Sequence, residues 1–373
     1  MHVGQKEALT QQRVVQLFRE QLGYDYLGDW TDREGNRNIE EEYLRAFLSD
    51  KQGCDEALIS RALYLLDKTA GDTSKHLYDR NKAVYELMRY GMKVKAEVGE
   101  NTQTVWLIDW KNPEKNHFAI AEEVTVLAAD AKAHAKRPDV VLYVNGIALG
   151  VLELKRSTVS VAEGIRQNRD NQKKEFIQPF FSTMQWVMAG NDTAGLRYGA
   201  IETKEKYYLK WKEESIVENL LDRALIQLCA KARFLELIHD FIVFDAGTKK
   251  LCRANQYFGV RAAQERGSAA RAATSGTHRA QARASRWCGL RNGFVSMPGI
   301  PVCSSLQIAG IWMSSSKRFS WASMKASTGR RVAQILLPRS TVQPHGLSVR
   351  LFISLGAWKK RKRAAIFQAI SRN

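Results

Sequence analysis

Two apolar, β-rich runs flank the dipeptide Asn145-Gly146, and this arrangement constrains the fold more than any other part of the sequence. An Asn-Gly pair between two such runs is the strongest short-range signal of a β-hairpin. Because side chains alternate along a strand, Glu153 and Lys155 are expected on the same face of the second strand. Asp139 opens the first strand, so the hairpin is expected to bring it beside Glu153 and Lys155.

These three side chains are typical of a metal-dependent nuclease centre. Asp139 and Glu153 supply the hard oxygen ligands that Mg²⁺ prefers, and waters and phosphate oxygens complete its shell. A bound metal acidifies a water and offsets the charge that builds on phosphorus. Lys155 is suited to orient that water or to stabilise the transition state. The competing interpretation is a salt-bridged hairpin edge, in which Glu153 and Lys155 are solvated charges.

The positive charge of the chain is concentrated at one end. The 373 residues carry a formal net charge of +18. Residues 267–373 contain no Asp or Glu and 18 Lys or Arg, which leaves 57 − 18 = 39 basic residues against all 39 acidic ones in residues 1–266. A stretch of this length without a carboxylate is far from average composition. A basic arm that binds nucleic acid is one explanation.

A shifted reading frame is a second explanation for residues 267–373. One permitted codon choice for residues 278–284 is CAC-AGG-GCT-CAG-GCA-AGA-GCC. Read from the last base of its first codon, this text encodes Gln-Gly-Ser-Gly-Lys-Ser, a Gly-rich phosphate-binding loop close to the P-loop pattern. In the same shifted frame, the codons of residues 301–309 permit an apolar sequence that is typical of a buried strand. We therefore expect that the frame slips between Arg266 and Ala273, and that residues 267–373 form an unstructured basic tail.

Short family-like stretches are spread over residues 5–258. They are QKEALTQ (5–11), NRNIE (36–40), WLIDW (106–110), EEVT (122–125), RPD (137–139), ELKRS (153–157), GIRQN (164–168), MAGND (188–192), GLRYG (195–199), FDAG (244–247) and NQYF (255–258).

Through these stretches, residues 1–266, about seven-tenths of the chain, resemble the N-terminal part of the restriction (R, motor and nuclease) subunit of type I restriction enzymes. In that family the next segment is a helicase-like translocase motor that opens with the ATP-binding loop. The shifted reading frame encodes a sequence close to that loop.

The resemblance implies an α/β fold with a PD-(D/E)xK-type nuclease core and flanking helices. It implies a nuclease domain at 1–213, a helical linker and start of the motor domain at 214–266, and a frame-shifted tail at 267–373. Asp139, Glu153 and Lys155 would be catalytic, with Asp139 and Glu153 as the Mg²⁺ ligands. Many such nucleases add a Gln-x-x-x-Tyr element on the following helix. Gln167 stands at a fitting place for a catalytic role, but Asn171 occupies the Tyr position, and a helix-surface amide is the alternative.

The resemblance also implies cofactors and partners. Residues 253–260 resemble the glutamine element upstream of the ATP loop, so Gln256 would contact adenine; without the P-loop, ATP binding by this chain is not expected. The implied function is the Mg²⁺-dependent endonuclease domain of a type I restriction subunit, acting on double-stranded DNA. In the intact family, specificity and methyltransferase subunits are its partners. The alternatives are an inactive truncated product whose basic tail binds nucleic acid non-specifically, and a standalone nuclease with the same core.

The remaining patterns concern compartment and secondary structure. Five scattered cysteines, no signal-peptide core and no long apolar run predict a cytoplasmic protein that does not enter a membrane. Tyr207, Tyr208 and Trp211 alternate with lysines, which is typical either of single-strand binding or of packing at a domain boundary. One of Glu40–Glu42 either caps a helix or reaches the metal. Apolar spacing predicts helices at 9–22 (with Thr10 as N-cap), 39–48, 56–66, 82–92, 161–174 and two within 216–241, and strands at 104–110, 118–126, 180–189 and 197–202.

Overall fold

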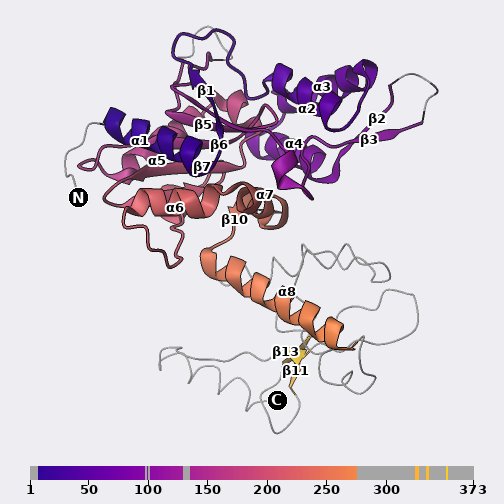
Figure 1. Cartoon of the computed structure of the whole chain (residues 1–373), viewed down its shortest axis with the longest axis vertical. Coiled ribbons are helices and arrows are strands. Elements are labelled where there is room, and N and C mark those ends of the chain that lie inside the picture. The colour runs from indigo at the N-terminus through magenta and orange to yellow at the C-terminus, as the bar shows by residue number, and fades with distance from the viewer. Residues whose placement is uncertain are drawn as a thin grey trace. The chain divides into compact units, whose positions relative to one another are not determined.

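The computed structural model describes residues 7–96, 99, 101–128 and 135–274, and three short strands within 324–351. The chain divides into two compact units, Met1–Gly259 and Val260–Asn373. The first unit is built on a six-stranded mixed sheet with the order β1-β4-β5-β6-β7-β8 (Figure 1). The strands are β1 Asp25–Asp29, β4 Phe118–Glu122, β5 Val140–Val144, β6 Ile147–Leu154, β7 Trp186–Asn191 and β8 Gly195–Gly199.

Helices α1 to α7 and two small hairpins belong to the same unit as this sheet, whereas α8 runs on into the second unit (Figure 1). The hairpins pair β2 Met92–Val94 with β3 Gln103–Val105, and β9 Ile242–Asp245 with β10 Thr248–Leu251. The helices are α1 Glu7–Glu20, α2 Glu41–Asp50, α3 Glu56–Ala70, α4 Leu77–Tyr90, α5 Val161–Asn171, α6 Leu220–Cys229, α7 Lys231–Asp240 and α8 Ala254–Thr274, with 3-10 turns η1 Pro113–Lys115, η2 Gln178–Ser182 and η3 Glu205–Tyr207.

The predicted hairpin around Asn145-Gly146 is present as β5 and β6. Both turn residues have positive φ, 50° at Asn145 and 78° at Gly146, as the type I′ turn requires. A Cβ at Gly146 would lie 2.4 Å from the Glu40 carbonyl oxygen, so this position needs glycine for space as well as for backbone conformation. Both strands are buried along their whole length, which makes this hairpin the centre of the sheet.

The two faces of the sheet carry different helices. Consecutive residues of β7 point to opposite faces, and a Cβ built on Gly164 of α5 would meet Ala189, whereas one on Gly190 would meet Leu221 of α6. Helix α5 therefore covers one face and α6 the other. Helix α1 lies beside α6, because Arg13 forms ion pairs with both Asp192 and Asp222. The connection β6–α5–β7 joins two parallel strands, the usual role of a crossover helix.

Several predicted elements differ from the structure at their ends. Thr10 lies inside α1 rather than at its N-cap, and its hydroxyl donates to Asp192. The apolar run 180–189 begins as η2 and enters β7 only at Trp186, because Pro179 has no N–H to donate to a sheet. The strand predicted at 104–110 is limited to β3. The two helices within 216–241 are present as α6 and α7.

The segment 214–266 holds a hairpin as well as helices, and a buried lysine anchors that hairpin. Lys249 of β10 is 2% exposed, and its Nζ donates to Asn81 Oδ1, Gln185 Oε1 and the Met184 carbonyl oxygen at 2.6–3.1 Å. These three acceptors offset part of the cost of burying the group, and burial still lowers the pKa of Lys249 well below its ordinary value. Lys249 joins β10 to α4 and to the loop before β7.

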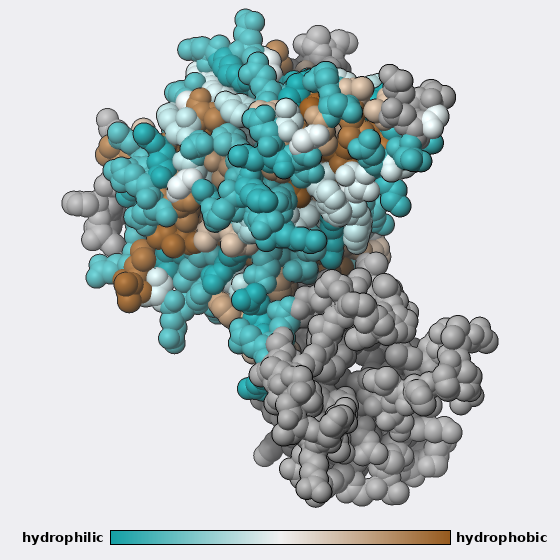
Figure 2. Space-filling view, turned by 45° about the vertical axis from the view of Figure 1, so that its right-hand side comes forward, coloured by the Kyte–Doolittle hydropathy of each residue, from teal (hydrophilic) through white to brown (hydrophobic). Residues whose placement is uncertain are grey.

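The predicted tail is described in part only. Helix α8 extends to Thr274, and β11 Met324–Ala326, β12 Ala333–Ile335 and β13 Arg350–Leu351 form a small antiparallel sheet. The rest of the predicted frame-shifted tail lies outside the described residues. Among those that are described, Cys54, Cys229 and Cys252 are free thiols, and no helix is long and apolar enough to cross a membrane. Figure 2 shows a largely hydrophilic face with scattered apolar patches over the described residues.

Candidate active site

The hairpin brings the three predicted catalytic side chains together. The register pairs Val140 with Leu152, which sets Asp139 opposite Glu153 on the next step of the ladder. The backbone N–H of Leu154 donates to Asp139 Oδ2 at 2.6 Å. Lys155 Nζ lies 2.8 Å from Glu153 Oε1.

Burial shapes the electrostatics of the two carboxylates. Asp139 is 8% exposed and Glu153 is fully buried. Burial raises the pKa of Asp139 to about 6; the Lys155 ammonium and the Leu154 N–H oppose this shift, and Glu123 and Glu7 add to it. Burial and then the Asp139 charge raise the pKa of Glu153 well above its usual value. Two carboxylates that share a dry site resist ionising together.

The carboxylate pair fits a divalent cation. Glu153 Oε2 is buried and has no hydrogen-bond partner among the described residues. A cation beside it would satisfy this oxygen and would relieve the repulsion with Asp139. Within the described part of the chain, no group of three or more His, Cys, Asp or Glu is arranged to hold a metal. The protein would therefore supply two carboxylates and leave the other positions to water and phosphate, a shell that Mg²⁺ accepts.

Lys155 is held by more than the predicted carboxylate. Its Nζ also lies 3.1 Å from Glu7 Oε1 and 2.8 Å from the Leu154 carbonyl oxygen. Burial alone would lower the pKa of Lys155, but Glu153, Asp139 and Glu7 raise it, so the side chain is a charged ammonium. Glu7 belongs to the first turn of α1 and is 148 residues away from Lys155 in the chain. Spacing along the sequence carries no signal of this contact, and sequence analysis missed it.

Gln167 lies at the same site. A cavity of about 490 Å³ opens beside the carboxylates, and Gln167, exposed on α5, lines it together with Asp139, Glu153 and Lys155. Asn171, at the position of the expected tyrosine, is buried and does not line the cavity. The structure therefore brings together all four predicted catalytic residues. The same cavity is lined by residues that were not predicted, among them Glu7, Gln11, Glu123 and Arg137.

Other candidates lie elsewhere. Glu40 forms an ion pair with Arg33, and none of the three acidic residues at 40–42 lines the cavity, so the acid that reaches the site from a helix is Glu7. Gln256 accepts a hydrogen bond from the Arg253 N–H at the start of α8 and does not line the cavity.

The aromatic residues at 207–211 mostly serve packing. Trp211 is buried against Tyr198, Tyr257 and Phe258. Tyr208 packs against the buried cluster under α5. This favours the packing interpretation for both side chains over single-strand binding.

Comparisons with known proteins agree with the resemblance. The family described as type I restriction enzyme R protein N terminus matches residues 4–206. A putative type I restriction enzyme MjaIXP endonuclease subunit of Methanocaldococcus jannaschii is 24% identical over 66% of this chain and 26% of its own length. A second subunit of that organism, MjaVIIIP, is 32% identical over 46% of this chain and 17% of its own. The HindI endonuclease subunit of Haemophilus influenzae is 24% identical over 48% and 18%.

The chain thus spans about a quarter or less of the length of these relatives. The family match covers 203 of 373 residues, from 4 to 206, and includes every residue of the cavity described above. The chain belongs to the family of type I restriction enzyme R protein N-terminal regions.

Proposed function

We propose that this chain carries the Mg²⁺-dependent DNA endonuclease centre of a type I restriction subunit and acts in the cytoplasm. The observation that carries the proposal is the buried pair Asp139 and Glu153, whose unpaired oxygen and mutual repulsion suit a divalent cation at the edge of an open cavity. Most buried carboxylate oxygens have a hydrogen-bond partner, and a bound cation would supply the partner that Glu153 Oε2 lacks. The family to which the chain belongs supports the same function.

Each site residue has a role that follows from its position. Asp139 and Glu153 would hold Mg²⁺, which supplies an acidified water and offsets negative charge on the phosphate. Lys155 fixes the rotamer of Glu153 and places a positive charge at the cavity wall, where it stabilises charge that develops on the phosphate. Gln167 lines the cavity, and its amide, which has no hydrogen-bond partner among the described residues, is suited to a phosphate oxygen or a water. Strand cleavage of double-stranded DNA is the reaction that uses this set.

The partners follow from the family rather than from the geometry. In an intact restriction subunit, specificity and methyltransferase subunits would choose the target, and ATP-driven translocation would precede cleavage. The amino-acid sequence of this chain contains no P-loop motif, so we expect no DNA-stimulated ATP hydrolysis from it. The second candidate, an inactive product whose basic tail binds nucleic acid, is favoured only by the charge of residues 267–373.

Plasmid nicking by the full chain tests the proposal. We expect conversion of supercoiled DNA to nicked circles that requires Mg²⁺ and stops with EDTA. Asp139→Ala, Glu153→Gln and Lys155→Ala should each lower the rate by at least about a hundredfold, the scale on which removal of one charge-stabilising group acts. Asp32→Asn, an exposed carboxylate outside the cavity, is the matched control. Nicking that persists in all three variants, or that is absent from the wild type, would favour the inactive alternative.

A further inference from the structure

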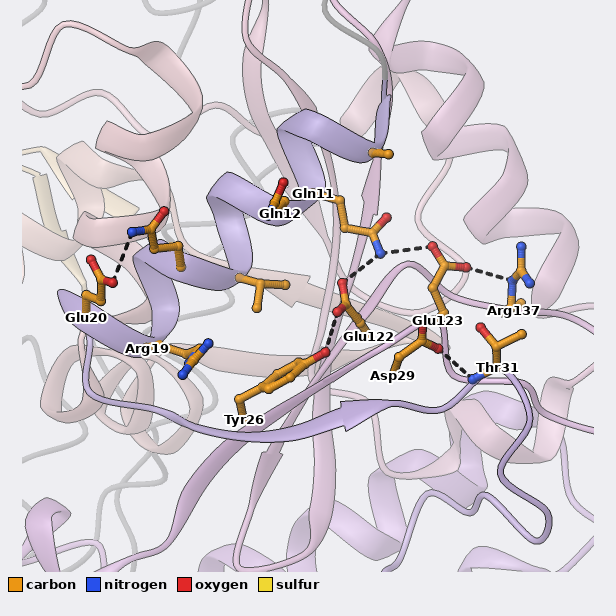
Figure 3. A pocket seen from close by; sticks show the side chains of 13 residues that line it. Gln11, Gln12, Arg19, Glu20, Tyr26, Asp29, Thr31, Glu122, Glu123 and Arg137 are labelled. Carbon is orange, nitrogen blue, oxygen red and sulfur yellow. Dashed lines mark hydrogen bonds and ion pairs between the residues drawn. The ribbon is translucent and has the colours of Figure 1, made fainter.

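A second cavity adjoins the proposed catalytic one. It has a volume of about 860 Å³ and lies between α1, β1 and the end of β4 (Figure 3). We call it the α1 groove; its wall includes Gln12, Gln16, Arg19, Tyr26 and Asp29. Four residues line both the catalytic cavity and the α1 groove, namely Ala8, Gln11, Glu123 and Arg137, and the last three are polar.

Glu123 is the centre of this shared wall. Its Oε1 accepts a hydrogen bond from Gln11 Nε2 at 2.9 Å, and its Oε2 lies 2.7 Å from Arg137 Nε (Figure 3). Its backbone N–H donates to the Asp139 carbonyl oxygen at 2.9 Å. Glu123 has a φ of 49°, a left-handed conformation that is uncommon for residues other than glycine. Such conformations persist where the surroundings fix them, and they cluster at functional sites.

The ion pair with Glu123 orients the Arg137 side chain but engages only part of its guanidinium. Its side chain is 52% exposed. Only Nε is paired; the terminal nitrogens Nη1 and Nη2 have no hydrogen-bond partner among the residues that the structure describes. A guanidinium held at Nε presents its two terminal N–H groups as a fork, the geometry that binds phosphate through two parallel hydrogen bonds.

Charge decides on which side of Arg137 a phosphate would bind. The α1 groove is lined by Glu20, Asp29, Glu122 and Glu123 against Arg19 and Arg137, which gives −4 + 2 = −2. The catalytic cavity is lined by four carboxylates and three cations, −4 + 3 = −1, and a bound divalent cation makes it +1. A polyanion is therefore attracted to the metal-loaded catalytic cavity and repelled by the groove.

We propose that Arg137 binds a DNA backbone phosphate next to the scissile one, with Glu123 as its positioning residue. The inference rests on the proposed function, since it takes the catalytic cavity as the place of cleavage. Arg137 would then mark the border of the DNA path, because the acidic α1 groove lies beyond it. Glu123 acts through Arg137 by fixing Nε, and its strained backbone aims the carboxylate at that nitrogen.

Binding measured without cleavage tests this assignment independently of the nuclease. The full chain is titrated with a short fluorescent duplex in Ca²⁺, at 150 to 200 mM salt so that purely electrostatic binding is weak. Arg137→Ala should weaken binding on the order of tenfold, the effect of losing one charge-assisted contact, and should lower the salt slope by about 0.9. Arg19→Ala, at the far end of the α1 groove, is the control and should leave both values unchanged. Equal behaviour of the two variants would overturn the proposal.

Two further variants separate phosphate binding from a structural effect. Arg137→Lys keeps the charge without the fork and should recover only part of the affinity. Glu123→Gln should weaken binding in the wild type but add nothing to Arg137→Ala, because both changes remove the same contact. Additive losses would show that Glu123 acts elsewhere. A duplex with a single neutral methylphosphonate at the contacted position should bind the wild type more weakly, yet bind Arg137→Ala no worse than the unmodified duplex does.

Discussion

At the scale of single residues, the site is a set of charges that the fold forces together. Asp139 and Glu153 repel each other in a buried place, and Lys155 and the Leu154 N–H only partly offset the cost. Such an arrangement destabilises the folded chain wherever both carboxylates are ionised. Function and stability should therefore have opposite dependence on pH.

Asp139→Asn should raise the free energy of unfolding, and only at a pH at which Asp139 of the folded wild type is ionised. The folded pKa of Asp139, about 6, lies above its ordinary value of 3.8. The stability gained from the bound proton is fully present below about pH 4 and is lost as pH rises through about 6. The Asn side chain has no proton to lose, so its melting temperature should match the wild type at pH 4 and exceed it at pH 8. Nicking by the wild type should fall as pH drops below about 6, because protonated carboxylates do not hold Mg²⁺.

Thermal melts at pH 4, 6 and 8 measure this difference, with Asp32→Asn as the control for loss of an exposed charge. Added Mg²⁺ should raise the wild-type melting temperature at pH 8, because a ligand that binds only the folded state stabilises it. The same addition should have little effect on Asp139→Asn. A difference between variant and wild type that stays constant from pH 4 to pH 8 would contradict the argument.

Site residues that lie close together in the sequence could be predicted, and those that reach the site through long-range contacts could not. Asp139, Glu153 and Lys155 lie on one hairpin, so the turn signal and strand alternation were enough to place them together. Glu7 and Glu123 reach the same cavity through tertiary packing. A glutamate in the first turn of a helix, such as Glu7, usually serves the helix dipole, and Glu123 follows the end of β4 with no local pattern that predicts its place at the cavity.

At the scale of elements, the long helices and the central hairpin could be predicted from the sequence. The exact ends of elements and the peripheral hairpin of β9 and β10 could not. The Asn145-Gly146 turn was visible because its chemistry is specific. The hairpin of β9 and β10 was missed because its residues are partly exposed and Lys249 is buried. A buried lysine breaks the rule that apolar periodicity marks the inside. Its burial is explained only by acceptors from α4 and from the loop before β7.

Gly146→Ala should lower the free energy of unfolding by more than its strained backbone conformation alone would. Gly146 and Gly35 have similar positive φ, 78° and 72°, but a Cβ at Gly35 meets nothing within 4 Å, whereas at Gly146 it meets a backbone oxygen at 2.4 Å. Gly35→Ala should therefore cost on the order of 1 kcal/mol from the φ strain. Gly146→Ala should cost clearly more, because β5 and β6 must move away from α2. Urea denaturation of the two variants measures the difference, and equal losses of unfolding free energy would refute it.

At the scale of the whole molecule, the charge distribution separates two kinds of contact that the proposed function would make with DNA. Residues 1–266 are neutral overall, and residues 267–373 hold the whole excess of 18 positive charges. Contacts at the catalytic cavity involve a few placed groups, whereas those of a basic tail would depend only on charge density. The two kinds differ in salt dependence, because each neutralised phosphate adds about 0.9 to the slope of log affinity against log salt.

A chain that ends at Thr274 keeps α8 and loses 17 of those 18 basic residues, since only Arg271 remains. We expect it to lose most of its salt-sensitive affinity for DNA and to keep Mg²⁺-dependent nicking, because the cavity residues all lie in the first unit. Replacing the five basic residues 359–363 by Gln in the full chain is a milder variant. It should reduce the salt slope by at most 4 to 5, as five fewer phosphate contacts require. If nicking disappeared with the tail while the folded unit kept its melting temperature, residues 275–373 would belong to the enzyme itself, and the shifted-frame explanation would be wrong.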